Sequence, residues 1–139
     1  MKDYNGFTGA QRTRALAWLN KEYAAGRRQR PAGCDACGQT EGFFQAHSED
    51  YSGPPFGDNI GRFGLCYLCH MFIHCRFRSP SAWARYVALV RTGRMGPNPA
   101  KADFGRIQRM LGGKSGWGPG DWLPSPRGAG PSFLDTLAG

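Results

Sequence analysis

The sequence predicts one small α+β domain, in which a metal-binding centre is flanked by helices and followed by an extended C-terminal tail. A length of 139 residues suits a single domain. The 21 glycines and 10 prolines leave few residues for a large core. Two Cys-x-x-Cys pairs are the third observation, because a bound metal can stabilise a small core. We divide the chain into four parts: a basic helical arm (1–33), a cysteine-rich centre (34–75), basic helices (76–112) and a Gly/Pro-rich tail (113–139).

The basic arm contains the first predicted helix, which runs from Gly9 to Tyr23. Thr8 stands in the position of an N-cap residue, and Gly26 follows as a stop signal. Four residues at helical spacing form the predicted apolar stripe: Ala15, Leu16, Leu19 and Tyr23. The basic side chains of this helix are then left facing mostly outward: Arg12, Arg14 and Lys21.

Two further helices are predicted after the centre, and both start with the same signal. Ser79-Pro80 and Asn98-Pro99 each place a capping residue before a proline, which is favoured at the first helical position. We expect the earlier helix to end at Gly93 and the later one at Gly112.

The tail is predicted to be extended rather than helical. Residues 112–131 include seven glycines and four prolines, which disfavour regular structure. Trp117 and Trp122 lie within this stretch, and we expect them to pack on the core rather than to stack on a nucleic-acid base.

Four of the five cysteines form two pairs: Cys34-x-x-Cys37 and Cys66-x-x-Cys69. Each pair can present two thiolates to one tetrahedral ion, so together they predict a closed structural zinc (Zn²⁺) site. Gly33 and Gly38 are expected to supply the tight turns around the first pair. The fifth cysteine, Cys75, lies outside both pairs and is expected to be a small buried apolar residue.

Two features of the composition bear on location. The chain has no apolar run long enough to cross a bilayer and no signal-peptide pattern at Met1, so we expect a cytoplasmic protein without a membrane partner. The cytoplasm is reducing, which favours metal ligation by the cysteines over disulfide formation.

The net charge of +8 is unevenly distributed. Residues 1–33 carry +5, residues 34–75 carry −4, residues 76–114 carry +8 and residues 115–139 carry −1. Basic segments on both sides of an acidic centre favour a polyanionic partner such as nucleic acid. We expect seven arginines to contact phosphates: Arg27, Arg28, Arg30, Arg76, Arg78, Arg85 and Arg91.

All three histidines, His47, His70 and His74, lie within the centre. If a helix begins near Cys69, the rings of His70 and His74 project from one face of it, as two ligands of one ion must. His47 would come from the extended segment that starts at Gly42. The trio can hold a second ion, or one or more imidazoles can be a structural ligand or a capping group.

Four segments of the centre form one ordered pattern: Cys34-x-x-Cys37-Gly38, Ala46-His47-Ser48-x-Asp50-Tyr51, Asn59 and Leu65-Cys66-x-x-Cys69-His70-x-x-x-His74. This pattern resembles the HNH endonuclease family, whose members are also called His-Me finger or ββα-metal nucleases. It is most similar to the zinc-knuckle type found in small phage and bacterial proteins. The resemblance covers residues 34–75 and implies a bacterial or phage-encoded protein.

The resemblance implies a ββα-metal finger, which is a β-hairpin followed by a helix, here braced by the four-cysteine zinc. It implies a catalytic divalent ion, Mg²⁺, Mn²⁺ or another, held by His47, His70 and His74. In the family this ion binds the scissile phosphate while a histidine base activates water. Asn59 takes the place of the middle asparagine, which steadies the loop and the base. The implied activity is metal-dependent hydrolysis of phosphodiester bonds in duplex DNA, and a homodimer is compatible with it.

One position departs from the family pattern. Where the family has two adjacent histidines, ligand and then base, this chain has His47-Ser48. In one interpretation Ser48 occupies the base position and cleavage is weak or absent, because a serine hydroxyl is not an ordinary general base. In a second, Ala46 and His47 fill the ligand and base positions, which leaves the metal one ligand fewer. In a third, another side chain activates water: Tyr51, Glu49 or Asp50.

A rival interpretation follows from the same departure. The chain can be a cleavage-incompetent, zinc-stabilised module that uses the HNH scaffold to bind DNA, RNA or a protein. Cleavage of plasmid DNA with Mg²⁺ or Mn²⁺ distinguishes this module from the endonuclease.

Overall fold

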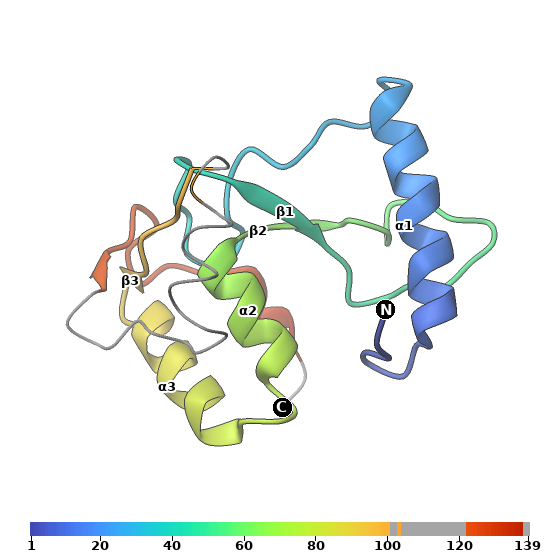
Figure 1. Cartoon of the computed structure of the whole chain (residues 1–139). Coiled ribbons are helices and arrows are strands. Elements are labelled where there is room, and N and C mark those ends of the chain that lie inside the picture. Colours follow the sequence, from blue (N-terminus) through green and yellow to red (C-terminus); the bar gives the residue numbers. More distant parts are fainter. Residues whose placement is uncertain (101–102, 104–121, 138–139) are drawn as a thin grey trace.

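The computed structural model describes residues 1–100, 103 and 122–137. Its elements, in chain order, are α1 (Gly9–Ala24), β1 (Phe44–His47), β2 (Phe63–Cys66), α2 (Tyr67–Cys75), α3 (Pro80–Arg91), β3 (Arg94–Met95), β4 (Leu123–Pro124) and a 3₁₀ helix, η2 (Phe133–Thr136). This mixture of helices and two small sheets confirms the predicted α+β class. The β1–β2 hairpin lies between α1 on one side and α2 and α3 on the other (Figure 1). None of the helices in the described ranges has the length and apolar character to cross a bilayer.

The hairpin and α2 form one continuous unit. Strands β1 and β2 are antiparallel, with Phe44 opposite Cys66 and His47 opposite Phe63. Helix α2 begins at Tyr67, directly after the last residue of β2. No connecting loop separates them, so α2 packs against the hairpin that precedes it, and residues one and two turns into the helix lie beside β1.

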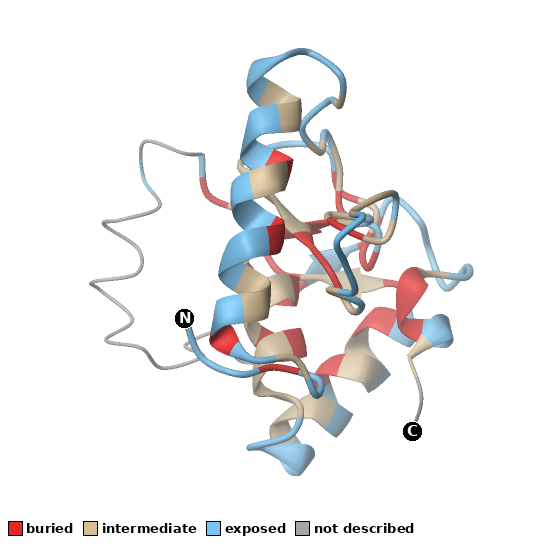
Figure 2. Cartoon of the chain, turned by 90° about the vertical axis from the view of Figure 1, so that its right-hand side faces the viewer, coloured by how far each residue is buried: buried red, intermediate tan, exposed pale blue. Residues whose placement is uncertain are grey.

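Helix α1 begins where the sequence predicts. Thr8 and Gln11 form a capping box, in which the Gln11 N–H donates to Thr8 Oγ1 (3.1 Å) and the Thr8 N–H donates to Gln11 Oε1 (2.7 Å). Ala15 and Leu19 are buried, and together with Ile60 they form a small core of their own. The buried positions of α1 all face the rest of the chain (Figure 2). The prediction for Leu16 is wrong, because its side chain is 41% exposed and borders a cavity rather than this core.

The larger core surrounds the cysteines. Leu65 of β2 and Ile73 of α2 are fully buried in it, and Tyr86 and Val90 of α3 pack against them. Helix α3 starts at Pro80, as predicted, and stops before Gly93, whose φ of +80° is a conformation that glycine adopts without strain.

The predicted helix that starts at Asn98-Pro99 lies largely outside the described residues. The Asn98 side chain does not act as the expected cap within the described part. Its Oδ1 accepts from the Tyr67 N–H (3.1 Å), and its Nδ2 donates to the Phe43 carbonyl (2.8 Å). Asn98 therefore joins the start of α2 to the segment before β1.

The tail contains one short helix beyond the stretch predicted to be extended. Trp117 lies outside the described residues, whereas Trp122 is buried against the larger core, as expected. Ser132 caps this helix, η2, which follows residues 112–131. Phe133 and Leu134 of that helix are buried, and this apolar pair supplies the reason for it to form.

Candidate metal centres and their surroundings

The four paired cysteines meet in the larger core. Cys34 and Cys37 come from the loop before β1, Cys66 ends β2, and Cys69 lies in the first turn of α2. One sulfur from each lies within 4.8 Å of the others, and all four residues are buried. Cys37 Sγ and Cys66 Sγ are 3.9 Å apart. A tetrahedral ion about 2.3 Å from each sulfur would set its ligands about 3.8 Å apart, so the cluster could hold a metal such as zinc.

The turn at the first cysteine pair is built as a metal knuckle requires. Gly38 has a φ of +85°, and its N–H donates to the Cys34 carbonyl (2.8 Å). The Gln39 side chain donates to Cys37 Sγ (3.3 Å). The expectation for Gly33 is not met, because its φ is not positive and a Cβ there would make only ordinary contacts, 3.5 Å and beyond.

The thiols need a cation to ionise together. Burial raises the pKa of the Cys69 thiol, and hydrogen bonds among the four sulfurs raise it further. At Cys34 burial also raises the pKa, but hydrogen bonds from the other three thiols outweigh it and lower the pKa. The pKa of Cys37 is lowered as well and that of Cys66 is raised, so ionisation of some of the sulfurs competes with ionisation of the others. A bound divalent ion removes this competition, because coordination deprotonates thiols outright.

The fifth cysteine differs from its prediction. Cys75 is half-buried rather than buried, because it ends α2 beside solvent. Arg78 Nη2 donates to its sulfur (2.8 Å). It takes no part in the four-cysteine cluster.

The three histidines form a second cluster beside the hairpin. One ring nitrogen from each of His47, His70 and His74 lies within 4.8 Å of the other two. The Nε2 atoms of His70 and His74 are 2.9 Å apart. Two ligands about 2.1 Å from one ion and at right angles would be about 3 Å apart. The end of β1 and one face of α2 thus bring together three imidazoles that could hold a single ion.

Oxygen acceptors hold two of these rings in the tautomer that a metal needs. Gln45 Oε1 lies 2.9 Å from His70 Nδ1, so Nδ1 carries the hydrogen and Nε2 keeps its lone pair. Glu49 Oε2 lies 2.5 Å from His47 Nε2, so in the neutral ring the lone pair is on Nδ1. That Nδ1 is buried and has no hydrogen-bond partner within the described part of the chain. Such outer partners are typical of metal-bound histidine.

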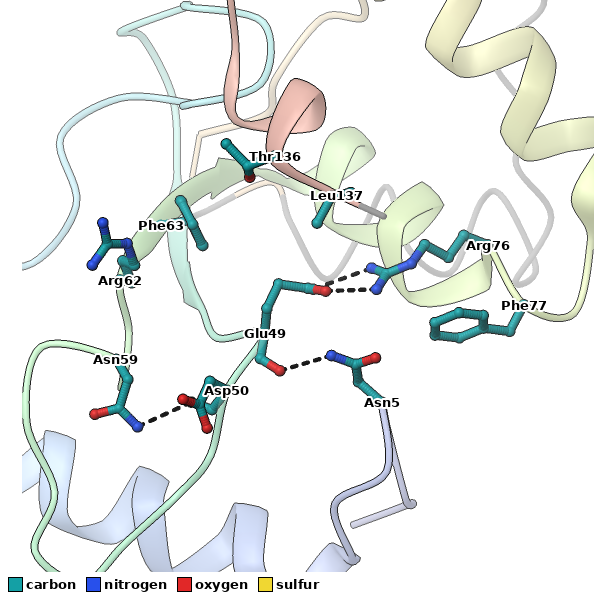
Figure 3. A pocket seen from close by; sticks show the side chains of 10 residues that line it. All are labelled: Asn5, Glu49, Asp50, Asn59, Arg62, Phe63, Arg76, Phe77, Thr136 and Leu137. Carbon is teal, nitrogen blue, oxygen red and sulfur yellow. Dashed lines mark hydrogen bonds and ion pairs between the residues drawn. The ribbon is translucent and has the colours of Figure 1, made fainter. Parts of the chain in front are cut away.

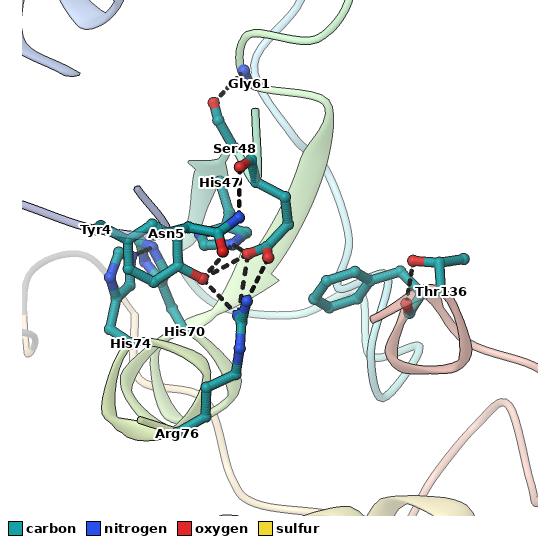
Figure 4. A network of polar contacts seen from close by, with 11 residues as sticks. Tyr4, Asn5, His47, Ser48, Gly61, His70, His74, Arg76 and Thr136 are labelled. Carbon is teal, nitrogen blue, oxygen red and sulfur yellow. Dashed lines mark hydrogen bonds and ion pairs between the residues drawn. The ribbon is translucent and has the colours of Figure 1, made fainter. Parts of the chain in front are cut away.

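Glu49 is the centre of a polar network that joins Tyr4, His47 and Arg76, three residues labelled in Figure 4. Its carboxylate accepts from the Tyr4 hydroxyl (2.5 Å) and from both terminal nitrogens of Arg76 (2.5 and 3.1 Å), in addition to His47. Burial raises the pKa of Glu49, but hydrogen bonds from His47, Arg76 and Tyr4 outweigh it and bring the pKa to about 2. Glu49 is therefore ionised at neutral pH. Its carboxylate positions the neighbouring side chains by accepting their hydrogen bonds, and it is a weak base.

The imidazoles are neutral at pH 7. Burial lowers the pKa of His47 and of His70, and it lowers that of His74 to about 4. The positive charge of Arg12 lowers all three further. Neutral imidazole is the form that binds metals.

Ser48 and Asn59 lie close to the trio but contact the backbone. Ser48 is buried, and its hydroxyl accepts from the Gly61 N–H (2.7 Å). Asn59 Nδ2 donates to the carbonyls of Ser52 (3.0 Å) and Asp50 (3.3 Å), so it bridges the loop that follows β1. His47, by contrast, stands with His70 and His74.

The remaining base candidates have other partners. The Asp50 carboxylate is exposed and accepts from the backbone and side chain of Ser52. Hydrogen bonds from Ser52 lower its pKa. Tyr51 is half-buried, with its ring packed edge-on against Phe7 and beneath the Arg12 guanidinium.

A cavity of about 570 Å³ lies beside Glu49 (Figure 3). Glu49 and Asp50 line it together with Arg62 and Arg76, so its walls carry both signs of charge. Phe77, 62% exposed, stands at its edge.

The seven arginines predicted to contact phosphates differ in their surroundings. Two have structural roles: Arg76 is paired with Glu49 and its side chain is 9% exposed, and Arg28 donates to the Ile60 carbonyl (2.5 Å). Three lie near a local acceptor: Arg27 beside Glu22, Arg91 beside Asp135 and Arg78 beside Cys75. The other two are exposed: Arg30, whose guanidinium lies over the Tyr23 ring, and Arg85.

Three residues around the histidines were not predicted from the sequence: Gln45, Tyr4 and Arg12. Gln45 could have been found, because it lies two positions before His47 in a strand and therefore on the same face. Tyr4 and Arg12 are more than thirty positions away from His47, and no sequence signal places them there.

No match to this chain was found among protein-family models, curated proteins or solved structures. The candidate sites are therefore interpreted from their own residues.

Proposed function

We propose that this protein is a metal-dependent DNA endonuclease of the HNH type, with Zn²⁺ on the four cysteines and Mg²⁺, Mn²⁺ or a related divalent ion on His47, His70 and His74. The observation that carries the proposal is the convergence of the three histidines at the junction of β1 and α2. Their order on an antiparallel hairpin followed directly by a helix agrees with a ββα-metal finger. The chain's net charge of +8 is compatible with a DNA partner.

The residues around the proposed ion would have separate roles in binding and positioning it. The three imidazoles would hold the ion, while Gln45 and Glu49 keep His70 and His47 in place. A divalent ion at such a site supplies charge stabilisation to a phosphate and to its leaving oxygen. Asn59 holds the loop after β1.

A cleavage-incompetent DNA-binding module remains the second candidate, and Ser48 favours it. This residue stands where the family has its histidine base, and its buried hydroxyl is bonded to Gly61. We therefore expect slow cleavage by the wild-type chain. Salt-sensitive DNA binding without cleavage would favour the module.

Relaxation of supercoiled plasmid tests the proposal. With Mn²⁺ or Mg²⁺ the wild-type chain should nick the plasmid slowly, and His74→Ala should not nick it at all, because one of the three ligands is missing. Cys75→Ser is the matched control, since Cys75 is the next residue and belongs to neither cluster. No nicking by the wild type with any divalent ion, or equal nicking by His74→Ala, would contradict the proposal.

Gln45→Leu should lower the affinity of the three histidines for a divalent ion without changing zinc binding by the four cysteines. The change removes the acceptor of His70 Nδ1–H, and loss of such a partner costs about 10- to 100-fold in metal affinity. Competition with a fluorescent chelator for Mn²⁺ measures this. Gln29→Leu, at an exposed position outside the site, should leave the affinity unchanged. Equal Mn²⁺ affinities in the two variants would exclude Gln45 from this role.

A further inference from the structure

A second cavity, of about 440 Å³, includes His70 and His74 in its wall, whereas no histidine is among the described residues that line the Glu49 cavity. It lies between α1 and the hairpin. Arg12 and Arg30 line it, and no carboxylate is among its described lining residues. Of the two cavities, this one has the charge that suits a phosphate.

Arg12 lines this cavity and has no acidic partner among the described residues. Its guanidinium carbon lies 5.3 Å from the centre of the Tyr4 ring and 5.2 Å from that of Tyr51, and Nη1 donates to the Lys2 carbonyl (2.5 Å). Its Nε is buried and has no hydrogen-bond partner in the described part of the chain. A guanidinium fixed in the wall of this cavity, close to His70 and His74, is suited to a phosphate oxygen.

Aromatic rings supply the other half of a nucleotide site. Four such side chains line the cavity: Tyr23, Phe43, Phe44 and Tyr51. Arg30 lies over the Tyr23 ring at 4.6 Å and is itself exposed. Aromatic and guanidinium planes are the surfaces on which unpaired bases stack.

We propose that this cavity binds one unpaired nucleotide of a DNA strand, with Arg12 on its phosphate and the Tyr23–Arg30 pair against its base. The proposal deepens the endonuclease function and rests on it for the identity of the cleaved phosphate. The cavity volume is near the lower end of the range of about 300–1,000 Å³ typical of small-ligand sites. A base still paired and stacked in a duplex cannot enter such a space. The preferred substrate is therefore single-stranded DNA or a site where a base is unpaired.

Fluorescence anisotropy with zinc-loaded protein and Ca²⁺ tests this without requiring cleavage. A short labelled oligothymidine strand should bind at least about tenfold more tightly than a blunt duplex of equal length, because stacking contributes about 1–3 kcal/mol per base. Arg12→Gln should weaken strand binding about tenfold. It should also flatten the slope of log affinity against log salt by roughly 0.7, as the loss of one phosphate contact on a single strand does. Tyr23→Leu should weaken binding by a similar factor with the slope unchanged.

Arg14→Gln is the charge-matched control, because Arg14 is exposed on α1 and does not line the cavity. It should leave both affinity and slope unchanged. Arg12→Lys keeps the charge and should keep the wild-type slope, which preserves the test if Arg12→Gln does not fold. Equal or tighter binding of the duplex, or equal effects of Arg12→Gln and Arg14→Gln, would overturn the proposal. Strand binding as expected without any cleavage would instead contradict the nuclease function alone.

Discussion

Cys66→Ser should unfold the centre of the chain. Cys66 is fully buried, ends β2 and caps the start of α2, so a metal bound there joins the hairpin and α2 to the loop of Cys34 and Cys37. Metal binding in small zinc domains contributes on the order of 10 kcal/mol or more to folding. We expect one zinc per chain in wild-type protein purified without added metal. In Cys66→Ser we expect the zinc and the cooperative thermal transition to be lost.

Cys75→Ser provides the matched control for this experiment. Cys75 is half-buried and outside the cluster, so its replacement should retain the zinc and shift the thermal midpoint little. Absence of zinc from the wild-type chain, or an unchanged midpoint in Cys66→Ser, would show that the four cysteines do not hold a structural ion.

Ser48→His should accelerate cleavage about 10²- to 10⁴-fold, which is the usual contribution of a positioned general base. Ser48 is among the residues that line the cavity whose wall also includes His70 and His74, and we expect an imidazole at this position to extend toward them. The change removes the hydrogen bond from the Gly61 N–H, at a cost of about 1 kcal/mol in stability. Initial rates of plasmid nicking in Mn²⁺ measure the gain.

Ser48→Gln distinguishes the effect of a general base at this position from the effect of a larger side chain. Glutamine is similar in size to histidine but cannot accept a proton at neutral pH, so its rate should stay at the wild-type level or below. The opposite assignment, with His47 as the base, makes different predictions. Brisk wild-type cleavage that Ser48→His fails to improve, together with undiminished metal affinity in His47→Ala, would support it.

Local sequence patterns predicted the parts of the fold that short-range chemistry determines. Thr8 and Pro80 mark the starts of α1 and α3, because capping and proline preferences act within one turn. The spacing of the four cysteines predicted their cluster, because two Cys-x-x-Cys turns can converge on one centre. The four-residue interval between His70 and His74 likewise places both rings on one helix face.

Long-range packing decides what the sequence could not supply. Leu16 has the spacing of the apolar stripe of α1. Ala15 and Leu19, however, make the contact with Ile60, and Leu16 lies at the edge of the cavity. From the sequence, Arg76 is an arginine in a basic segment that is expected to contact phosphate. In the structure its guanidinium is hydrogen-bonded to Tyr4 and Glu49, which are distant in sequence, and these bonds hold it beneath the surface. Such pairings depend on how the N-terminal segment crosses the hairpin, which no local pattern encodes.

We propose that His47, His70 and His74 hold a divalent ion separate from the zinc proposed at the four cysteines. This can be tested with a crystal of zinc-loaded protein soaked in Mn²⁺, with anomalous data collected on both sides of the manganese absorption edge. We expect one manganese peak among the three imidazoles and a zinc peak among the four sulfurs. A manganese map with no peak at the histidines would show that the trio does not hold such an ion.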